Sequence, residues 1–83
     1  MKITIIIPVY NEINSIEILL NNVLRVDVNK QIIVVDDCST DGTKEKILEE
    51  FQDKIDKLIL HEKNYGKGAA IISAQKYING DYV

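Results

Sequence analysis

The chain has 83 residues, a formal net charge of −3 and a composition of 46% hydrophobic and 28% charged residues. This length allows one small domain at most, and without a basic run we expect no nucleic-acid partner. The single cysteine, Cys38, excludes an internal disulfide and fits a reducing compartment. No stretch approaches the roughly 20 apolar residues of a membrane helix, and the N-terminal run lacks the core and cleavage site of a signal peptide. We therefore expect a cytoplasmic protein.

Strand and helix patterns alternate from the N-terminus onward. Residues 3–7 form a near-continuous apolar run, which is typical of a strand covered on both faces. Apolar residues then recur at helical spacing over residues 13–24, and a second two-sided apolar strand is predicted at residues 31–35. A further amphipathic helix pattern reaches residue 55 and is followed by a short third strand at residues 58–60.

The last part of the chain continues this alternation. A third helix is predicted over residues 66–78 and is ended by Gly80, for which we expect the left-handed conformation. Residues 81–83 have the pattern of the start of a fourth strand. The order βαβαβαβ predicts an α/β fold, with an open, mainly parallel sheet that carries helices on both faces in a Rossmann-like arrangement.

Polar side chains follow the first two strands at the points where these strands end. Tyr10 and Glu12 come after the first strand, and Asp36 and Asp37 come at the end of the second. Parallel strands bring such residues to one edge of the sheet, where open α/β sheets bind their ligands. Because side chains alternate along a strand, Asp36 and Asp37 leave it on opposite faces. We expect Asp37 to face the ligand and Asp36 to turn inward and cap a loop or helix.

The third helix begins with the sequence Gly-Lys-Gly at residues 66–68. This turn can bring backbone N–H groups and the charge of Lys67 near phosphates. Tyr10 offers an aromatic face to a base, and carboxylates can accept hydrogen bonds from the N–H and O–H groups of a base or ribose. Together these groups suit a nucleoside diphosphate.

Each of these residues also has a purely structural interpretation. Glu12 could serve only the N-terminus of the following helix, and Tyr10 could serve only to cover the sheet edge. Lys67 could be a solvated surface side chain. His61, at the end of the third strand, is expected to be an ordinary surface residue.

Several common site patterns are absent. The P-loop pattern G-x-x-x-x-G-K-[ST] fails because position 61 is His61 and position 68 is Gly68. The dinucleotide fingerprint G-x-G-x-x-G fails because position 71 is Ile71 and the glycines follow the third strand. No pair of His or Cys has metal-ligand spacing, which excludes a structural zinc site.

Three segments, in this order, resemble the family-2 glycosyltransferases with a GT-A fold. They are Pro-Val-Tyr-Asn-Glu at residues 8–12, Val-Asp-Asp-Cys-Ser-Thr-Asp-Gly-Thr at 35–43 and Asn-Tyr-Gly-Lys-Gly-Ala-Ala at 64–70. Within the family the chain is most similar to the dolichyl- or polyprenyl-phosphate sugar transferases. The resemblance implies a UDP- or GDP-sugar donor, a divalent metal (Mg or Mn) and sugar transfer with inversion. It favours a polyprenyl-phosphate acceptor, while polysaccharide or protein acceptors stay open.

The resemblance also implies roles for single residues. Three residues after the first strand would border the nucleoside, two at the end of the second strand would contact the base, and two at the start of the third helix would lie near the diphosphate. Among them, Asp37 would accept the hydrogen bond of the base ring N–H, whereas Asp36 matches a position without a ligand role. The nucleotide-binding residues are, in this order, Pro8, Tyr10, Glu12, Val35, Asp37, Gly66 and Lys67.

The span of the chain sets a limit on the expected activity. In this family the strand that begins at residues 80–83 runs on into an Asp-x-Asp motif that binds metal and diphosphate, and the chain ends before it. We therefore expect residues 1–83 to be a single nucleotide-sugar-binding subdomain, truncated before that motif. It would hold no catalytic residue and no metal ligand, and alone it would have little or no transferase activity. The longer protein is expected to be cytoplasmic and to associate with a membrane.

Two other classes of function remain as alternatives. The first is a non-catalytic nucleotide-binding or assembly module, which would form a homodimer through an exposed edge of its sheet. The second is a receiver-like signalling domain, in which paired acids such as Asp36 and Asp37 hold magnesium. A receiver also needs an acidic residue at the end of the next strand, where this chain has His61.

Overall fold

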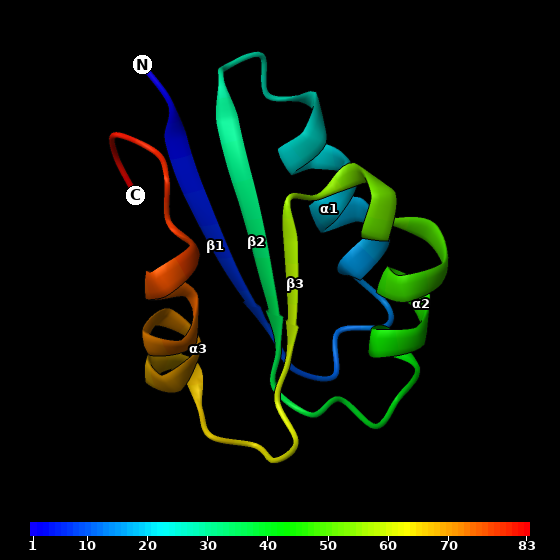
Figure 1. Cartoon of the computed structure of the whole chain (residues 1–83). Coiled ribbons are helices and arrows are strands. Elements are labelled where there is room, and N and C mark those ends of the chain that lie inside the picture. The colour runs from blue at the N-terminus through cyan, green and yellow to red at the C-terminus, as the bar shows by residue number, and fades with distance from the viewer.

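Three parallel strands form the sheet of the computed structural model, which describes all residues from 1 to 83 (Figure 1). They are β1 (Ile3–Val9), β2 (Lys30–Asp36) and β3 (Lys57–Leu60), and β2 lies between the other two. Each strand contains the apolar run from which it was predicted and is slightly longer than that run. The predicted open parallel sheet is confirmed.

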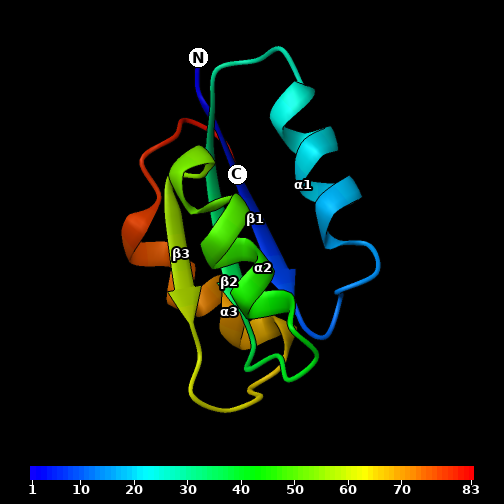
Figure 2. The same ribbon diagram turned by 90° about the vertical axis from the view of Figure 1, so that its right-hand side faces the viewer.

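Helices cover both faces of this sheet. α1 (Ile16–Arg25) and α2 (Thr43–Glu50) lie on one face, and α3 (Lys67–Ala74) lies on the other (Figures 1 and 2). Short 3₁₀ turns, η1 (Gln52–Lys54) and η2 (Gln75–Tyr77), follow α2 and α3, so both α-helices end before the predicted limits. None of the helices combines the length and the apolar character required to cross a bilayer.

Successive side chains of β2 point to opposite faces of the sheet and contribute to two separate hydrophobic clusters. Ile32 and Val34 point toward α1 and α2, whereas Ile33 and Val35 point toward α3. Because both faces are covered, the strand carries apolar residues on both, as its continuous pattern predicts. On the α3 side, two fully buried alanines, Ala70 and Ala74, complete the cluster. On the side of α1 and α2, larger side chains complete the other cluster: Ile7, Val9, Ile16, Leu20, Ile47 and Phe51.

The strand register brings the polar strand ends to one edge. Val9 pairs with Asp36, and Asp36 pairs with Leu60. The hydrogen-bond ladder continues one residue beyond these pairs. The Asp37 N–H donates to the Val9 carbonyl at 2.8 Å, and the His61 N–H donates to the Asp36 carbonyl at 2.9 Å. The expected meeting of polar residues at the carboxyl edge of the sheet is therefore present.

The end of the chain lies beside the free edge of β1. Tyr82 forms one parallel bridge with Ile3, and its carbonyl accepts the Thr4 N–H at 2.6 Å. This bridge stands where a fourth strand was predicted. Gly80 does not adopt the predicted left-handed conformation. It is needed for another reason, because a Cβ at this position would meet the Thr4 side chain and lie 3.0 Å from the Lys2 carbonyl.

Candidate nucleotide pocket

A pocket of about 340 Å³ opens at the carboxyl ends of β1 and β2. Its wall combines residues from the β1 end, the β2 end and the segment that enters α3, which are far apart in the sequence. It contains six of the seven residues that the sequence analysis assigned to a nucleotide, together with Val9. The lining residues are Pro8, Val9, Tyr10, Glu12, Asp37, Gly66 and Lys67.

Val35 is the predicted residue that the structure does not bring into the pocket. Its side chain is fully buried and packs with Ala70 and Ala74 beneath α3. Its side chain therefore cannot contact a ligand, and only its backbone could do so. The side chain contributes indirectly, because Val35 lies two residues before Asp37 on the same face of β2 and packs beneath the helix that begins at Lys67.

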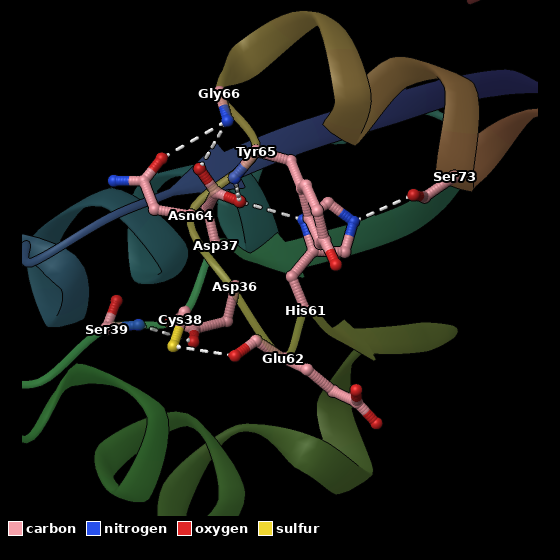
Figure 3. A network of polar contacts seen from close by, with 10 residues as sticks. All are labelled: Asp36, Asp37, Cys38, Ser39, His61, Glu62, Asn64, Tyr65, Gly66 and Ser73. Atoms are coloured by element: carbon pink, nitrogen blue, oxygen red, sulfur yellow. Dashed lines mark hydrogen bonds and ion pairs between the residues drawn. The ribbon is translucent and has the colours of Figure 1, made fainter.

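Asp37 is the centre of a hydrogen-bond network (Figure 3). Its Oδ1 accepts the Tyr65 N–H at 2.8 Å and lies 2.9 Å from His61 Nδ1, and its Oδ2 accepts the Gly66 N–H at 2.8 Å. The hydrogen bond from His61, followed by the one from Tyr65, holds the pKa of the Asp37 carboxyl below its usual value, against the opposing effect of burial. The carboxyl group is therefore an ionised acceptor, and it fixes the segment that leads into α3.

His61 is not the ordinary surface residue that the sequence analysis predicted. Its side chain is only 8% exposed, and its Nε2 lies 2.8 Å from the Ser73 hydroxyl on α3. A carboxylate can only accept, so Nδ1 carries the hydrogen toward Asp37. The Tyr65 ring packs edge-on against the imidazole, with 5.3 Å between centroids. The strand register gives the missing signal, since His61 follows β3 at the position in line with Asp37.

Asp36 has the inward position that strand alternation predicts. Its side chain is fully buried, and its Oδ2 accepts the Ser39 N–H at 3.0 Å, which shapes the loop after β2 (Figure 3). Its Oδ1 has no protein hydrogen-bond partner. Only Asp37 of the acidic pair lines the pocket.

Hydrogen bonds from the loop after β1 to the loop after β2 and to the first residue of α2 fix the β1 side of the pocket. The Asn11 N–H donates to the Ser39 hydroxyl at 3.0 Å, and the Glu12 N–H donates to Thr43 Oγ1 at 2.9 Å. The Glu12 carboxylate accepts the hydroxyl of Ser15, just before α1, at 2.9 Å. The Glu12 carboxylate therefore contacts the N-terminus of the following helix, which was the structural alternative for this residue, and Glu12 also lines the pocket. Tyr10 remains 45% exposed, so a ligand could reach it.

The positive charge of the pocket belongs to Lys67, the first residue of α3. It is exposed and forms no ion pair within the protein. No three His, Cys, Asp or Glu side chains lie close enough together to hold a metal ion. The residues of this chain therefore do not by themselves form a site for the divalent metal implied by the resemblance.

The match to a known family covers nearly the whole chain. The family described as glycosyl transferase family 2 matches residues 4–83. The chain belongs to this family. The match includes the three segments whose residues line the pocket, and membership of this family disfavours a receiver-like signalling domain.

Relatives of known activity agree with this assignment. The chain is 31% identical over 88 residues to an undecaprenyl-phosphate 4-deoxy-4-formamido-L-arabinose transferase of Photorhabdus laumondii, covering 99% of this chain and 27% of that protein. It is 39% identical over 84 residues to a dolichol-phosphate mannosyltransferase of Pyrococcus furiosus, covering 98% of this chain and 24% of that protein. The chain thus spans about a quarter of the length of these relatives.

Solved structures confirm the fold. A mannosyltransferase from Pyrobaculum calidifontis, in complex with GDP-Man and Mn²⁺, superposes with a TM-score of 0.84 at 30% identity, over 95% of this chain and 25% of that one. TarS of Staphylococcus aureus, residues 1–349 in complex with UDP-GlcNAc, gives a TM-score of 0.82 at 34% identity, over 100% of this chain and 26% of that one. Both are glycosyltransferases with the GT-A fold. The predicted Rossmann-like α/β arrangement is the N-terminal part of that fold.

Proposed function

We propose that residues 1–83 form the donor-nucleotide-binding part of an inverting glycosyltransferase that uses a UDP- or GDP-sugar. The observation that carries this proposal is that one pocket gathers six of the seven assigned residues at the carboxyl edge of the sheet. Family membership supports the same function. The span is a single subdomain that binds the nucleotide and does not transfer the sugar by itself.

Each part of the pocket has a proposed contact with the donor. The Tyr10 ring lies against the base, and Asp37 accepts the hydrogen bond of the base ring N–H. The Lys67 ammonium attracts the diphosphate at the start of α3, where backbone N–H groups also favour anions. Pro8 and Glu12 border the nucleoside. Gly66 shapes the turn, because its own N–H is already bonded to Asp37.

The remaining parts of the reaction are assigned to the longer protein. A neighbour binds Mn²⁺ together with GDP-Man, and a divalent metal would offset the diphosphate charge and assist its departure. We assign neither that metal nor the catalytic base to residues of this chain. The names of the relatives support a polyprenyl-phosphate acceptor, and hence a cytoplasmic protein that works at a membrane. We also propose a homodimer through the free sheet edge, which sedimentation equilibrium would test.

A nitrogen-15 NMR titration of the chain with UDP and with GDP, in the presence of Mg²⁺, tests nucleotide binding. We expect saturable shifts at the amides of Tyr10, Asp37 and Lys67. Lys67→Ala should weaken binding, whereas Lys63→Ala, a matched change at an exposed residue outside the pocket, should not. Absence of shifts at millimolar nucleotide, or shifts confined to the opposite edge of the sheet, would contradict the proposal.

A further inference from the structure

The hydrogen bonds of Asp37 leave one acceptor position open. An ionised carboxylate has two oxygens, each able to accept about two hydrogen bonds. Oδ1 already accepts from His61 Nδ1 and from the Tyr65 N–H, so its capacity is used. Oδ2 accepts only the Gly66 N–H. Within the protein, the one remaining acceptor position therefore lies on Oδ2 of a residue that lines the pocket.

The two donors to Oδ1 are themselves fixed. His61 is bonded to Ser73 on its other side, and its ring is packed against Tyr65. The Tyr65 N–H belongs to the backbone segment that enters α3. Turning the Asp37 carboxylate to free Oδ1 would leave both donors without their charged partner, and such hydrogen bonds are roughly twice as strong as neutral ones. The single open position is thus a stable property of the fold.

Nucleotide bases differ in how many donors they present on the edge that a carboxylate reads. Uracil presents one ring N–H, at N3, between two carbonyl groups. Guanine presents two neighbouring donors, N1–H and the exocyclic amine, and needs both oxygens of a carboxylate to satisfy them. Cytosine presents its exocyclic amine beside an N3 that carries no hydrogen, so an acceptor opposite N3 faces a lone pair. One open acceptor opposite the central ring nitrogen therefore satisfies uracil, leaves the guanine amine without this partner and disfavours cytosine.

We infer that this pocket selects a uracil nucleotide, so that the donor is a UDP-sugar, because His61 and Tyr65 occupy one oxygen of Asp37 and leave a single acceptor. This inference rests on the proposed function, namely that the pocket binds the donor nucleotide. It goes further by choosing between the two bases that the resemblance left open. His61 is thus a positioning residue that controls specificity through Asp37.

The inference is tested by titrating the chain with four nucleoside diphosphates in the presence of Mg²⁺. They are UDP, CDP, GDP and IDP. CDP keeps the ring size, ribose and diphosphate of UDP but lacks the N3 hydrogen. IDP keeps the purine and N1–H of GDP but lacks the exocyclic amine. We expect UDP to bind about tenfold or more tightly than CDP, which corresponds to one hydrogen bond at a charged acceptor. We expect GDP to bind no more tightly than IDP.

The outcomes separate this inference from the proposed function. If GDP binds about fivefold or more tightly than IDP, both oxygens of Asp37 are open and the inference is wrong. If all four bind equally, the pocket binds nucleotides but Asp37 does not read the base, which also overturns it. If none binds at millimolar concentration, the proposed function fails and this inference with it. Asp37→Ala should abolish the UDP–CDP difference while Asp36→Asn retains it, with NMR spectra of both variants confirming that they fold.

Discussion

The Nδ1 atom of His61 lies 2.9 Å from Oδ1 of Asp37, and the other ring nitrogen lies 2.8 Å from the Ser73 hydroxyl. These two contacts connect the ends of β2 and β3 to the C-terminal end of α3 (Figure 3). The same carboxylate holds the backbone of Tyr65 and Gly66. The group proposed to read the base therefore also fixes the segment that carries Lys67 to the diphosphate.

Replacement of His61 tests this link through stability. His61→Leu keeps most of the buried volume but removes both hydrogen bonds, so Asp37 loses one donor and Ser73 loses its partner. We expect the Tm to fall by about 4–8 °C, the shift that accompanies roughly 1 kcal/mol in a domain of this size. Thermal unfolding followed by circular dichroism measures it.

His61→Asn is the matched control for that change. An asparagine amide can place an N–H near the position of Nδ1 but cannot reach Ser73, so it should restore part of the lost stability and the hydrogen bond to Asp37. The amide nitrogen shifts of Tyr65 and Gly66 should return toward their original values in this variant. Equal loss of stability in the Leu and Asn variants would mean that ring packing, not the Asp37 contact, is what matters.

Gly66 and Gly68 form a matched pair for a test of the turn before α3. Gly66 has φ 88° and ψ 171°, a combination that is essentially restricted to glycine, and a Cβ there would meet nothing within 4 Å. Gly66→Ala should therefore cost about 1–3 kcal/mol through backbone strain alone. Gly68 lies inside α3, also in open space, and Gly68→Ala should stabilise the chain by about 0.5–1 kcal/mol. Urea unfolding of both variants would show the opposite signs, and a loss in both would contradict this explanation.

The lowered pKa of Asp37 predicts a specific acid sensitivity. The ordinary value of the carboxyl is 3.8 and the folded value lies below it, chiefly because of the His61 hydrogen bond. Its contribution to stability is therefore complete above the unfolded value and is lost as pH falls through the folded value. The stability difference between the wild type and Asp37→Asn should shrink from about pH 5 to pH 2 in urea unfolding. Asp53→Asn, at an exposed carboxylate, should show no such trend. A difference for Asp37→Asn that does not vary with pH would mean that the His61 hydrogen bond does not lower this pKa.

The two neighbouring acids should differ in their effect on donor binding. Asp37→Ala removes the proposed base acceptor and should weaken donor affinity by about tenfold or more, as expected for loss of a hydrogen-bond partner. Asp36→Asn should have a smaller effect, because Asp36 is buried and bonded to the Ser39 N–H. Isothermal calorimetry measures both. A larger loss for Asp36→Asn would mean that the roles of the two faces are reversed.

Much of the fold could be predicted because its signals are local. The apolar runs of β1 and β2 indicate strands covered on both faces, and helices do lie on both. Helix limits were predicted less well, since 3₁₀ turns replace the last turns of the second and third helices. The role of Gly80 depends on its approach to Thr4, a residue 76 positions away, which no local pattern reveals.

The pocket was largely predictable for a different reason. Parallel strands end at one edge, so Tyr10 and Asp37 were expected to meet, and both line the pocket. Strand alternation also placed Asp36 inward correctly. It also puts Val35 on the same face as Asp37, but α3 covers Val35 and keeps its side chain out of the pocket, which alternation alone does not reveal. The place of His61 beside Asp37 follows from the parallel register of β2 and β3, but its bond to Ser73 could not be predicted, because only the tertiary structure fixes the position of α3.

A crystal structure of the chain with UDP bound would test the central claim most directly. We predict that the uracil N3 lies within hydrogen-bond distance of Asp37 Oδ2, about 2.7–3.2 Å, while His61 and Tyr65 keep their bonds to Oδ1. A base bound outside the pocket of Tyr10 and Asp37, or a carboxylate that has left His61 to hold the base with both oxygens, would contradict it.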